Sequence, residues 1–213
     1  MPKPFATAPG SGLHFHLSIT DAQGRSVFTD DSDALHLSAQ AHQFVAGLLA
    51  HADALSAVCA PTVNSYKRLA SSHSASGTTW SPVWKSYGDN NRTCVVRPVA
   101  GRIEWRLPDP SCNVYTALAA TLAAGLDGIG CQLIPPVACE ADLYQLKATG
   151  CPMPARLPRD LLAAIDAFAS DQVLRAALGE GFCAEFIKLK CAEWDDYVTH
   201  VSEWEMRRYA DGF

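Results

Sequence analysis

The sequence predicts an α+β fold, with antiparallel strands in the first half of the chain and helices in most of the second half. Residues 13–19 alternate between apolar and polar side chains, which is the period of a half-buried strand. Beyond residue 110, apolar residues instead recur at three- and four-residue spacing, which is the period of helices. A group of strands followed by a run of helices favours segregated layers over a parallel, doubly wound sheet.

Three strands are expected, near residues 13–19, 93–97 and 102–107. Residues 21–24 (Asp-Ala-Gln-Gly) have the composition of a turn after the first strand. Residues 98–101 (Pro-Val-Ala-Gly) would connect the other two strands, which predicts an antiparallel pair.

One long helix and one long loop are expected between the first two strands. Apolar residues at helical spacing run from Ser38 to Val58, and Ser38 is a suitable N-cap. Residues 60–91 lack such a period and contain two prolines and two glycines. Loops of this length in compact domains are usually functional or disordered, and the two Trp and two Tyr residues weigh against disorder. We therefore expect a functional loop.

The second half predicts five helices, four of them with a recognisable start signal. They are expected over residues 114–129, 159–169, 172–178, 181–201 and 203–209. The start signals are an Asn113 cap, Pro158 in a first turn, an Asp171 cap and a capping box beginning at Ser202.

The composition excludes several classes of protein. A net charge of −5 and the absence of a basic run argue against nucleic-acid binding. The most apolar stretch, residues 117–129, is interrupted by two glycines and an aspartate, so we expect no membrane association. No secretory signal is evident, and none of the eight cysteines forms a C-x-x-C pair. We expect a cytoplasmic protein with reduced thiols.

Two histidines and two glycines form the first candidate site. His14 and His16 on one strand would share a face, about 7 Å apart. Such a pair can bind a metal or a phosphate, although such pairs also occur as ordinary polar residues on the surface of half-exposed strands. Gly10 and Gly12 directly precede the strand and would let the backbone approach a ligand closely.

A second strand carries a carboxylate between two guanidinium groups. Arg102, Glu104 and Arg106 would share one face of the strand at residues 102–107. A carboxylate in that setting stays ionised and can bind a hard cation, while the arginines neutralise phosphate oxygens. The alternative is an ion-pair ladder on an exposed edge strand.

Four arginines could converge on one anionic ligand. Arg68, Arg92, Arg97 and Arg106 lie on or after the expected long loop, beside amide and aromatic residues. Arginine is suited to a bidentate grip on carboxylate and phosphate. The alternative is that these are solvated loop charges.

Together these segments resemble the glutamine synthetase family. Six blocks occur in the family's order: residues 1–4 (MPKP), 10–16 (GSGLHFH), 61–68 (PTVNSYKR), 91–92 (NR), 104–109 (EWRLPD) and 124–129 (AGLDGI). The resemblance implies that residues 1–213 are the C-terminal portion of a single glutamine synthetase-type catalytic domain, whose N-terminal portion is absent. It also implies a ring-type homo-oligomer with active sites between subunits.

The implied activity is that of a ligase that joins ammonia or a small amine to the γ-carboxylate of glutamate. ATP would be the co-substrate, γ-glutamyl phosphate the intermediate, and Mg²⁺ or Mn²⁺ the metal. The resemblance assigns His14 and Glu104 to two different cations, His16 to the phosphoryl group, Arg68, Arg106 and Gly10 to glutamate, and Arg92 and Arg97 to phosphoryl transfer and nucleotide binding.

Two departures from the family qualify this interpretation. His14 and Glu104 are the only evident metal ligands, too few for a site with two or three cations. Residues 70–80 contain no acidic residue where ordinary members carry a Glu that helps to deprotonate ammonium. The motif S-G-x-T-W-x-P in residues 76–82 instead resembles the branch of γ-glutamylmethylamide synthetases and type III-like glutamine synthetases.

Two other interpretations differ in class. The chain could be a non-catalytic fragment or paralogue of the family that acts as a binding or assembly partner. It could also be an unrelated β-barrel metalloenzyme with an H-x-H site, although that interpretation does not account for the helical second half.

Overall fold

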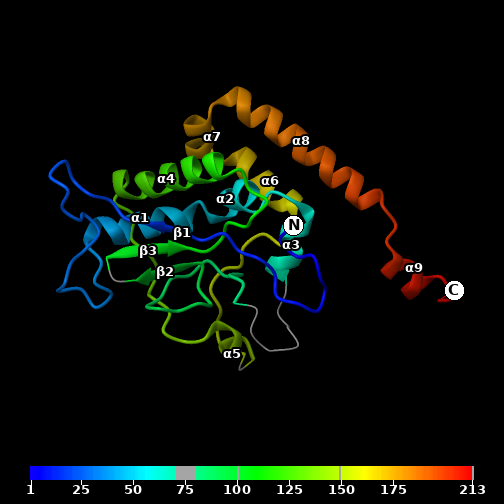
Figure 1. The fold of residues 1–213 in the computed structure, drawn as a ribbon, viewed down its shortest axis with the longest axis horizontal. Coiled ribbons are helices and arrows are strands. Elements are labelled where there is room, and N and C mark those ends of the chain that lie inside the picture. Colours follow the sequence, from blue (N-terminus) through cyan, green and yellow to red (C-terminus); the bar gives the residue numbers. More distant parts are fainter. Residues whose placement is uncertain (71–79, 100, 149, 213) are drawn as a thin grey trace.

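A three-stranded antiparallel sheet lies below a layer of helices in the computed structural model, which describes residues 1–70, 80–99, 101–148 and 150–212 (Figure 1). The strand order is β1-β3-β2, with β1 at Phe15–Leu17, β2 at Val96–Val99 and β3 at Arg102–Trp105. The α+β prediction and all three strands are confirmed, although each strand is shorter than expected.

Strand β2 lies further along the chain than the sequence predicted. Pro98 belongs to β2, opposite Ile103 of β3, and not to the connection after the strand. Proline lacks a backbone N–H, so it is tolerated where a strand forms hydrogen bonds on one side only. Among the described residues, β2 pairs within the sheet with β3 alone.

The helix expected from Ser38 to Val58 is two helices, so that prediction is wrong at one residue. Helix α1 (Ala39–Ala50) ends and α2 (Ala52–Cys59) begins at His51. The Ser38 cap is confirmed, because its hydroxyl oxygen accepts a bond from the Ala41 N–H at 3.1 Å. The His51 imidazole reaches two aspartates from other helices, a tertiary contact that helical periodicity does not encode.

Residues 60–91 also contain a helix that the sequence did not predict, α3 (Val63–Ala70). The helix has only eight residues, of which Tyr66 and Leu69 are the buried apolar ones, so it is too short for apolar periodicity to reveal it. The first turn is stabilised from a distance, because the Val63 N–H donates to the Glu193 carboxylate at 3.1 Å. The short helix α5 (Leu143–Ala148) was likewise missed.

The helical second half is confirmed. It contains α4 (Val114–Gly130), α6 (Leu161–Ser170), α7 (Gln172–Leu178), α8 (Glu180–Thr199) and α9 (Glu203–Tyr209). The caps at Asn113, Asp171 and Ser202 form as predicted. Helix α6 starts later than expected, because Asp160 caps it at the Ala163 N–H.

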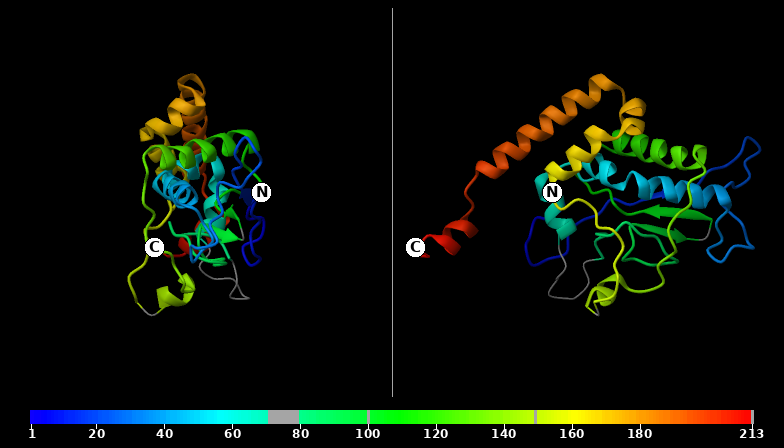
Figure 2. Two further views of the ribbon diagram at one scale, coloured as in Figure 1. Left: turned by 90° about the vertical axis from the view of Figure 1, so that its left-hand side faces the viewer. Right: turned by 180° about the vertical axis from the view of Figure 1, so that it is seen from behind.

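Glycines allow α1 and α4 to pack closely above the sheet (Figure 1). A Cβ atom on Gly128 would lie 2.2 Å from the Gln43 carbonyl oxygen, and one on Gly125 would lie 2.1 Å from the Phe44 ring. Helix α8 extends away from this body and leads to α9 at the C-terminus (Figure 2). Helices thus cover one face of the sheet, and its other face carries polar groups.

In the part of the chain that the structure describes, no helix is long and apolar enough to span a membrane. All eight cysteines have free thiols.

Candidate functional site

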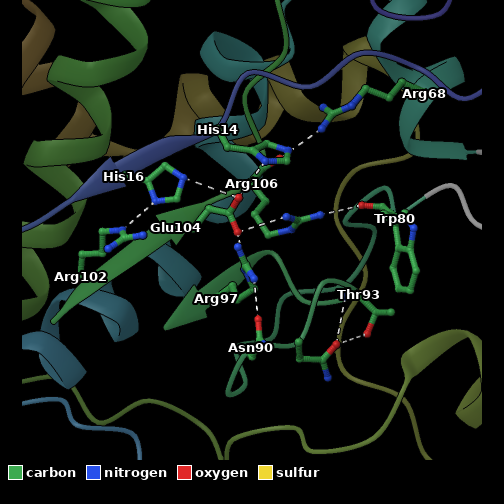
Figure 3. Close-up of polar contacts among 11 residues, drawn as sticks. His14, His16, Arg68, Trp80, Asn90, Thr93, Arg97, Arg102, Glu104 and Arg106 are labelled. Atoms are coloured by element: carbon green, nitrogen blue, oxygen red, sulfur yellow. Dashed lines mark hydrogen bonds and ion pairs between the residues drawn. The ribbon is translucent and has the colours of Figure 1, made fainter. Parts of the chain in front are cut away.

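Glu104 lies at the centre of a polar cluster on one face of the sheet (Figure 3). Strand β3 is the middle strand, and its register places Glu104 directly opposite His16 of β1 and Arg97 of β2. Side chains alternate along a strand, so Arg102 and Arg106 share the face of Glu104. The sheet itself therefore assembles residues that lie far apart in the sequence.

The Glu104 carboxylate contacts a different pair of groups with each oxygen. Oε1 lies 2.9 Å from His14 Nδ1 and 3.8 Å from His16 Nε2. Oε2 accepts from Arg97 Nε at 2.5 Å and from Arg106 Nη1 at 3.1 Å. His14 and Glu104 thus point to the same face, which a shared role at one centre requires.

Charge controls the protonation of both proposed metal ligands. Burial alone would raise the pKa of Glu104, but the hydrogen bond from Arg97 and the charge of Arg106 outweigh it and lower that pKa to about 2. Burial and the charge of Arg106 lower the pKa of His14, against the opposing effect of Glu104. Glu104 is therefore ionised at neutral pH, and His14 is neutral and keeps a nitrogen lone pair.

Arg68 lies beside His14 at the edge of this cluster (Figure 3) and is almost completely buried. Its guanidinium donates to the carbonyls of Leu107 at 2.9 Å and Arg106 at 3.1 Å. Burial lowers its pKa to about 10, so it remains charged at neutral pH. Gly12 makes room for it, since a Cβ there would lie 3.0 Å from Arg68 Nη2 and 2.7 Å from His14 Nε2.

Gly10 packs on the aliphatic part of the same arginine. A Cβ atom at Gly10 would lie 2.7 Å from the Pro2 carbonyl oxygen and 3.1 Å from Arg68 Cγ. In this structure, Gly10 and Gly12 let the backbone approach Arg68, the residue expected to bind substrate.

The remaining arginines surround Glu104 from the other side. Arg97 Nη1 donates to Asn90 Oδ1 at 2.6 Å, and Arg106 Nη2 donates to the Trp80 carbonyl at 3.0 Å (Figure 3). Arg92 is exposed, and its charge adds to the lowering of the Arg106 pKa by burial. The cluster therefore holds three arginines within mutual electrostatic reach, of which Arg92 faces solvent.

The alternatives left open by the sequence can now be separated. Glu104 and Arg106 are buried, so the motif is not an exposed ion-pair ladder. Arg102 is exposed and donates from Nε to His16 Nδ1 at 3.1 Å. Arg68 and Arg106 are not solvated loop charges, whereas Arg92 is exposed as that alternative expected.

The metal-binding capacity of the described residues is limited. Among them, no group of three or more His, Cys, Asp or Glu side chains is arranged to hold one ion. Asp109 is buried in a turn, where its carboxylate accepts from the Ser111 N–H at 2.9 Å. Among the described residues, His14 and Glu104 could each supply one ligand to a metal ion.

The sequence missed the contacts that position the arginines. The Trp80 carbonyl, which receives Arg106, has no sequence signature because every residue carries a carbonyl. Asn90 was recognised as part of a polar segment, but its bond to Arg97 was not predicted.

Comparisons with known proteins identify the family. Residues 1–209 match the glutamine synthetase catalytic domain. The chain belongs to the glutamine synthetase family. Over 220 residues it is 48% identical to a glutamate–methylamine ligase of Methyloversatilis universalis, covering 100% of this chain and 49% of that relative. Over 207 residues it is 44% identical to a glutamine synthetase of Rhizobium leguminosarum, covering 96% and 47% of the two chains.

Solved structures show the same resemblance. A GmaS–ADP complex superposes with a TM-score of 0.91 at 47% identity, over 99% of this chain and 48% of that one. Ligand-free GmaS gives a TM-score of 0.87 at 46% identity, over 99% and 47%. The chain spans about half the length of the relatives that it matches. These relatives confirm the predicted family and its γ-glutamylmethylamide branch; the loop that suggested the branch, residues 71–79, lies outside the described residues.

Proposed function

We propose that this chain is part of an ATP-dependent ligase that joins a small amine or ammonia to the γ-carboxylate of glutamate through γ-glutamyl phosphate. The observation that carries the proposal is the Glu104 cluster, in which an ionised carboxylate, two histidines and two arginines meet on one face of a sheet. Phosphoryl transfer requires such positioning and charge neutralisation. The relatives named as ligases support the same class of reaction.

Glutamate would be bound by Arg106, with Arg68 supporting it. Arg106 uses Nη1 for Glu104 and Nη2 for the Trp80 carbonyl, and among the described residues its buried Nε has no hydrogen-bond partner. The charge of this guanidinium would attract a substrate carboxylate to the same face of the sheet. Arg68 is buried behind Gly10 and Gly12, so its charge would attract the same carboxylate through a medium of low dielectric constant.

ATP would be bound by Arg92, Arg97 and His16. Arg92 is exposed and therefore available to phosphate oxygens, whereas Arg97 is fixed between Glu104 and Asn90. His16 receives a bond from Arg102 at Nδ1, which leaves Nε2 facing Glu104. Together these groups would neutralise charge that develops on the transferring γ-phosphoryl group.

Mg²⁺ or Mn²⁺ would be held by His14 and Glu104, one ligand for each of two ions. The ionised carboxylate and the neutral imidazole both fit that role. When bound, the metal would orient the phosphates and neutralise their charge. The remaining carboxylate ligands would come from residues outside this chain. We propose that the chain itself is a C-terminal portion of the catalytic domain.

The acceptor is proposed to be a small amine such as methylamine. Residues 70–80 contain no acidic side chain, so the sequence offers no carboxylate there to select a cationic ammonium ion. A relative at 48% identity is named as a glutamate–methylamine ligase. Ammonia remains the second candidate because the other relatives described here are named as glutamine synthetases.

We further propose that the protein works as a ring-type homo-oligomer in the cytoplasm. Large apolar side chains of α8 and α9 are exposed, which is expected of a subunit contact. They are Phe182, Leu189, Val198, Trp204 and Met206.

The test makes two measurements on the natively purified protein. Its mass shows which chains are present, and an assay measures its activity. Phosphate release from ATP is followed with glutamate, Mg²⁺ and either methylamine or ammonium. We expect release that depends on both glutamate and the amine, and that is strongly reduced in Arg92→Gln. Arg25→Gln, an exposed arginine in the loop after β1, is the matched control and should keep the parent rate. ATP hydrolysis that is indifferent to glutamate would contradict the proposal.

The alternative of a non-catalytic partner finds no support in the comparisons, since the described relatives carry the names of ligases. It predicts that the same native protein has no glutamate-dependent turnover with either amine.

A further inference from the structure

Helix α5 lies on the opposite side of the sheet from α4 (Figure 1), and its Tyr144 contacts Ser81 and Trp84. The Tyr144 hydroxyl of α5 donates to the Ser81 carbonyl at 2.6 Å. The Tyr144 ring packs edge-on against Trp84, with ring centroids 5.3 Å apart and planes at 74°. The hydroxyl and the ring thus make separate contacts, which substitution can separate.

Ser81 and its neighbour connect this contact to both arginines proposed to bind glutamate. The buried Ser81 hydroxyl donates to the Arg68 carbonyl at 3.0 Å. One residue earlier, the Trp80 carbonyl accepts from Arg106 Nη2 at 3.0 Å. Trp80 has a φ of 46°, a left-handed conformation that a residue with a large side chain adopts only when its surroundings hold it. The backbone of residues 80–81 is therefore fixed by two side chains from distant parts of the chain, Arg106 and Tyr144, and by the bond from the Ser81 hydroxyl to α3.

The start of α5 is itself anchored to the neighbouring loop. The Leu143 N–H donates to Thr93 Oγ1 at 3.2 Å, and Thr93 Oγ1 donates to Asn91 Oδ1 at 2.6 Å. Asn91 Nδ2 in turn donates to the carbonyls of Cys139 at 3.0 Å and Ala141 at 2.9 Å. Helix α5 is consequently a fixed support for the Tyr144 hydroxyl and does not depend on Ser81 for its own position.

We propose that Tyr144 is a positioning residue for glutamate binding: its hydroxyl fixes the backbone of residues 80–81, which holds the Arg106 guanidinium and the end of α3 that carries Arg68. This inference rests on the proposed function, because the role of both arginines is part of that function. Tyr144 acts through Ser81 and Trp80, without itself touching the substrate. On the nucleotide side of the site, Arg97 is held by Asn90 and Glu104, and Arg92 is exposed, so neither is bonded to this hydroxyl or to residues 80–81 in the contacts described.

The test substitution is Tyr144→Phe, which removes the hydroxyl and keeps the ring against Trp84. Losing one hydrogen bond that orders a binding site is expected to weaken glutamate binding about fivefold to tenfold. Binding of Mg²⁺–ADP should change less than twofold. The matched control is Tyr115→Phe on α4, where the tyrosine is 87% exposed.

Two measurements on the native protein distinguish the outcomes. Isothermal titration gives the Kd values for L-glutamate in the presence of Mg²⁺–ADP, and for Mg²⁺–ADP itself. Hydrogen exchange measures protection of the peptide that contains residues 80–81. Tyr144→Phe should weaken glutamate binding selectively and speed exchange in that peptide, and Tyr115→Phe should do neither.

Other results would overturn the inference in recognisable ways. If the parent binds glutamate and Tyr144→Phe binds it equally well, the positioning role is wrong and the proposed function stands. An equal loss of glutamate and nucleotide binding, with a lower melting temperature, would show a general packing role instead. If the parent binds nucleotide but no glutamate, the proposed function fails, and the positioning role fails with it.

Discussion

The charge of Glu104 is expected to stabilise the fold as well as to serve the site, and Glu104→Gln tests this. The substitution keeps the shape of the side chain and removes its charge from contact with Arg97 and Arg106. The Glu104 pKa falls from 4.5 to about 2, and one pKa unit is worth about 1.4 kcal/mol, so the ionised form contributes about 3 kcal/mol at neutral pH. Because glutamine still accepts a hydrogen bond, we expect a loss of about 2–3 kcal/mol.

The assay is equilibrium unfolding in urea at pH 7 in the presence of EDTA, followed by circular dichroism. The urea concentration at the midpoint of unfolding should fall, while the slope of the unfolding free energy against urea concentration stays unchanged. Together these results indicate an effect on stability alone. Glu203→Gln is the control, because Glu203 is 91% exposed and lies 3.6 Å from Arg207. An exposed pair of this kind contributes at most about 1 kcal/mol.

A double-mutant cycle with Arg97→Gln isolates the strongest contact. The coupling free energy between positions 97 and 104 is expected to exceed about 1 kcal/mol, since the two groups are in direct contact and mostly buried. If Glu104→Gln unfolds at the same urea concentration as the parent, the reasoning about this charge is refuted. Additive single substitutions would refute the specific pairing with Arg97.

Three further predictions follow from other parts of the chain. Burial would lower the pKa of His51, but hydrogen bonds to Asp171 and Asp127 outweigh burial and raise this pKa. The protonated His51 therefore stabilises the fold fully below about pH 6.5, and this stabilisation is lost as the pH rises through the raised pKa. Urea unfolding of the parent should show this loss of stability with rising pH, and His51→Gln should not. Gly128→Ala should destabilise the fold by about 2 kcal/mol, because the new Cβ would meet the Gln43 carbonyl oxygen. Gly130 has open space around it, so Gly130→Ala should be neutral or slightly stabilising in the same urea assay. Residues 1–213 purified alone, without the remaining part of the catalytic domain, should release no phosphate from ATP with glutamate, Mg²⁺ and either amine, because the described residues offer too few metal ligands; turnover at a normal enzyme rate would contradict the ligand count.

Local signals were sufficient for much of the secondary structure. The caps at Ser38, Asn113, Asp171 and Ser202 were predicted and form, because a cap depends on a few neighbouring residues. Helix α3 and the break at His51 were not predicted. Each depends on a side chain far along the chain, Glu193 in one case and Asp127 and Asp171 in the other.

The sequence by itself determined which residues could share a face, because the period of two along a strand is local. It placed His14 with His16 and Glu104 with Arg106, and the order of its motifs identified the family. Only the tertiary structure decided that these two strands are neighbours, which brings His14 to 2.9 Å from Glu104. It also decided that Arg68 is buried and that the Trp80 carbonyl receives Arg106. The physical reason is that burial and backbone hydrogen bonding depend on strand pairing and packing across the chain, which residue type and spacing do not specify.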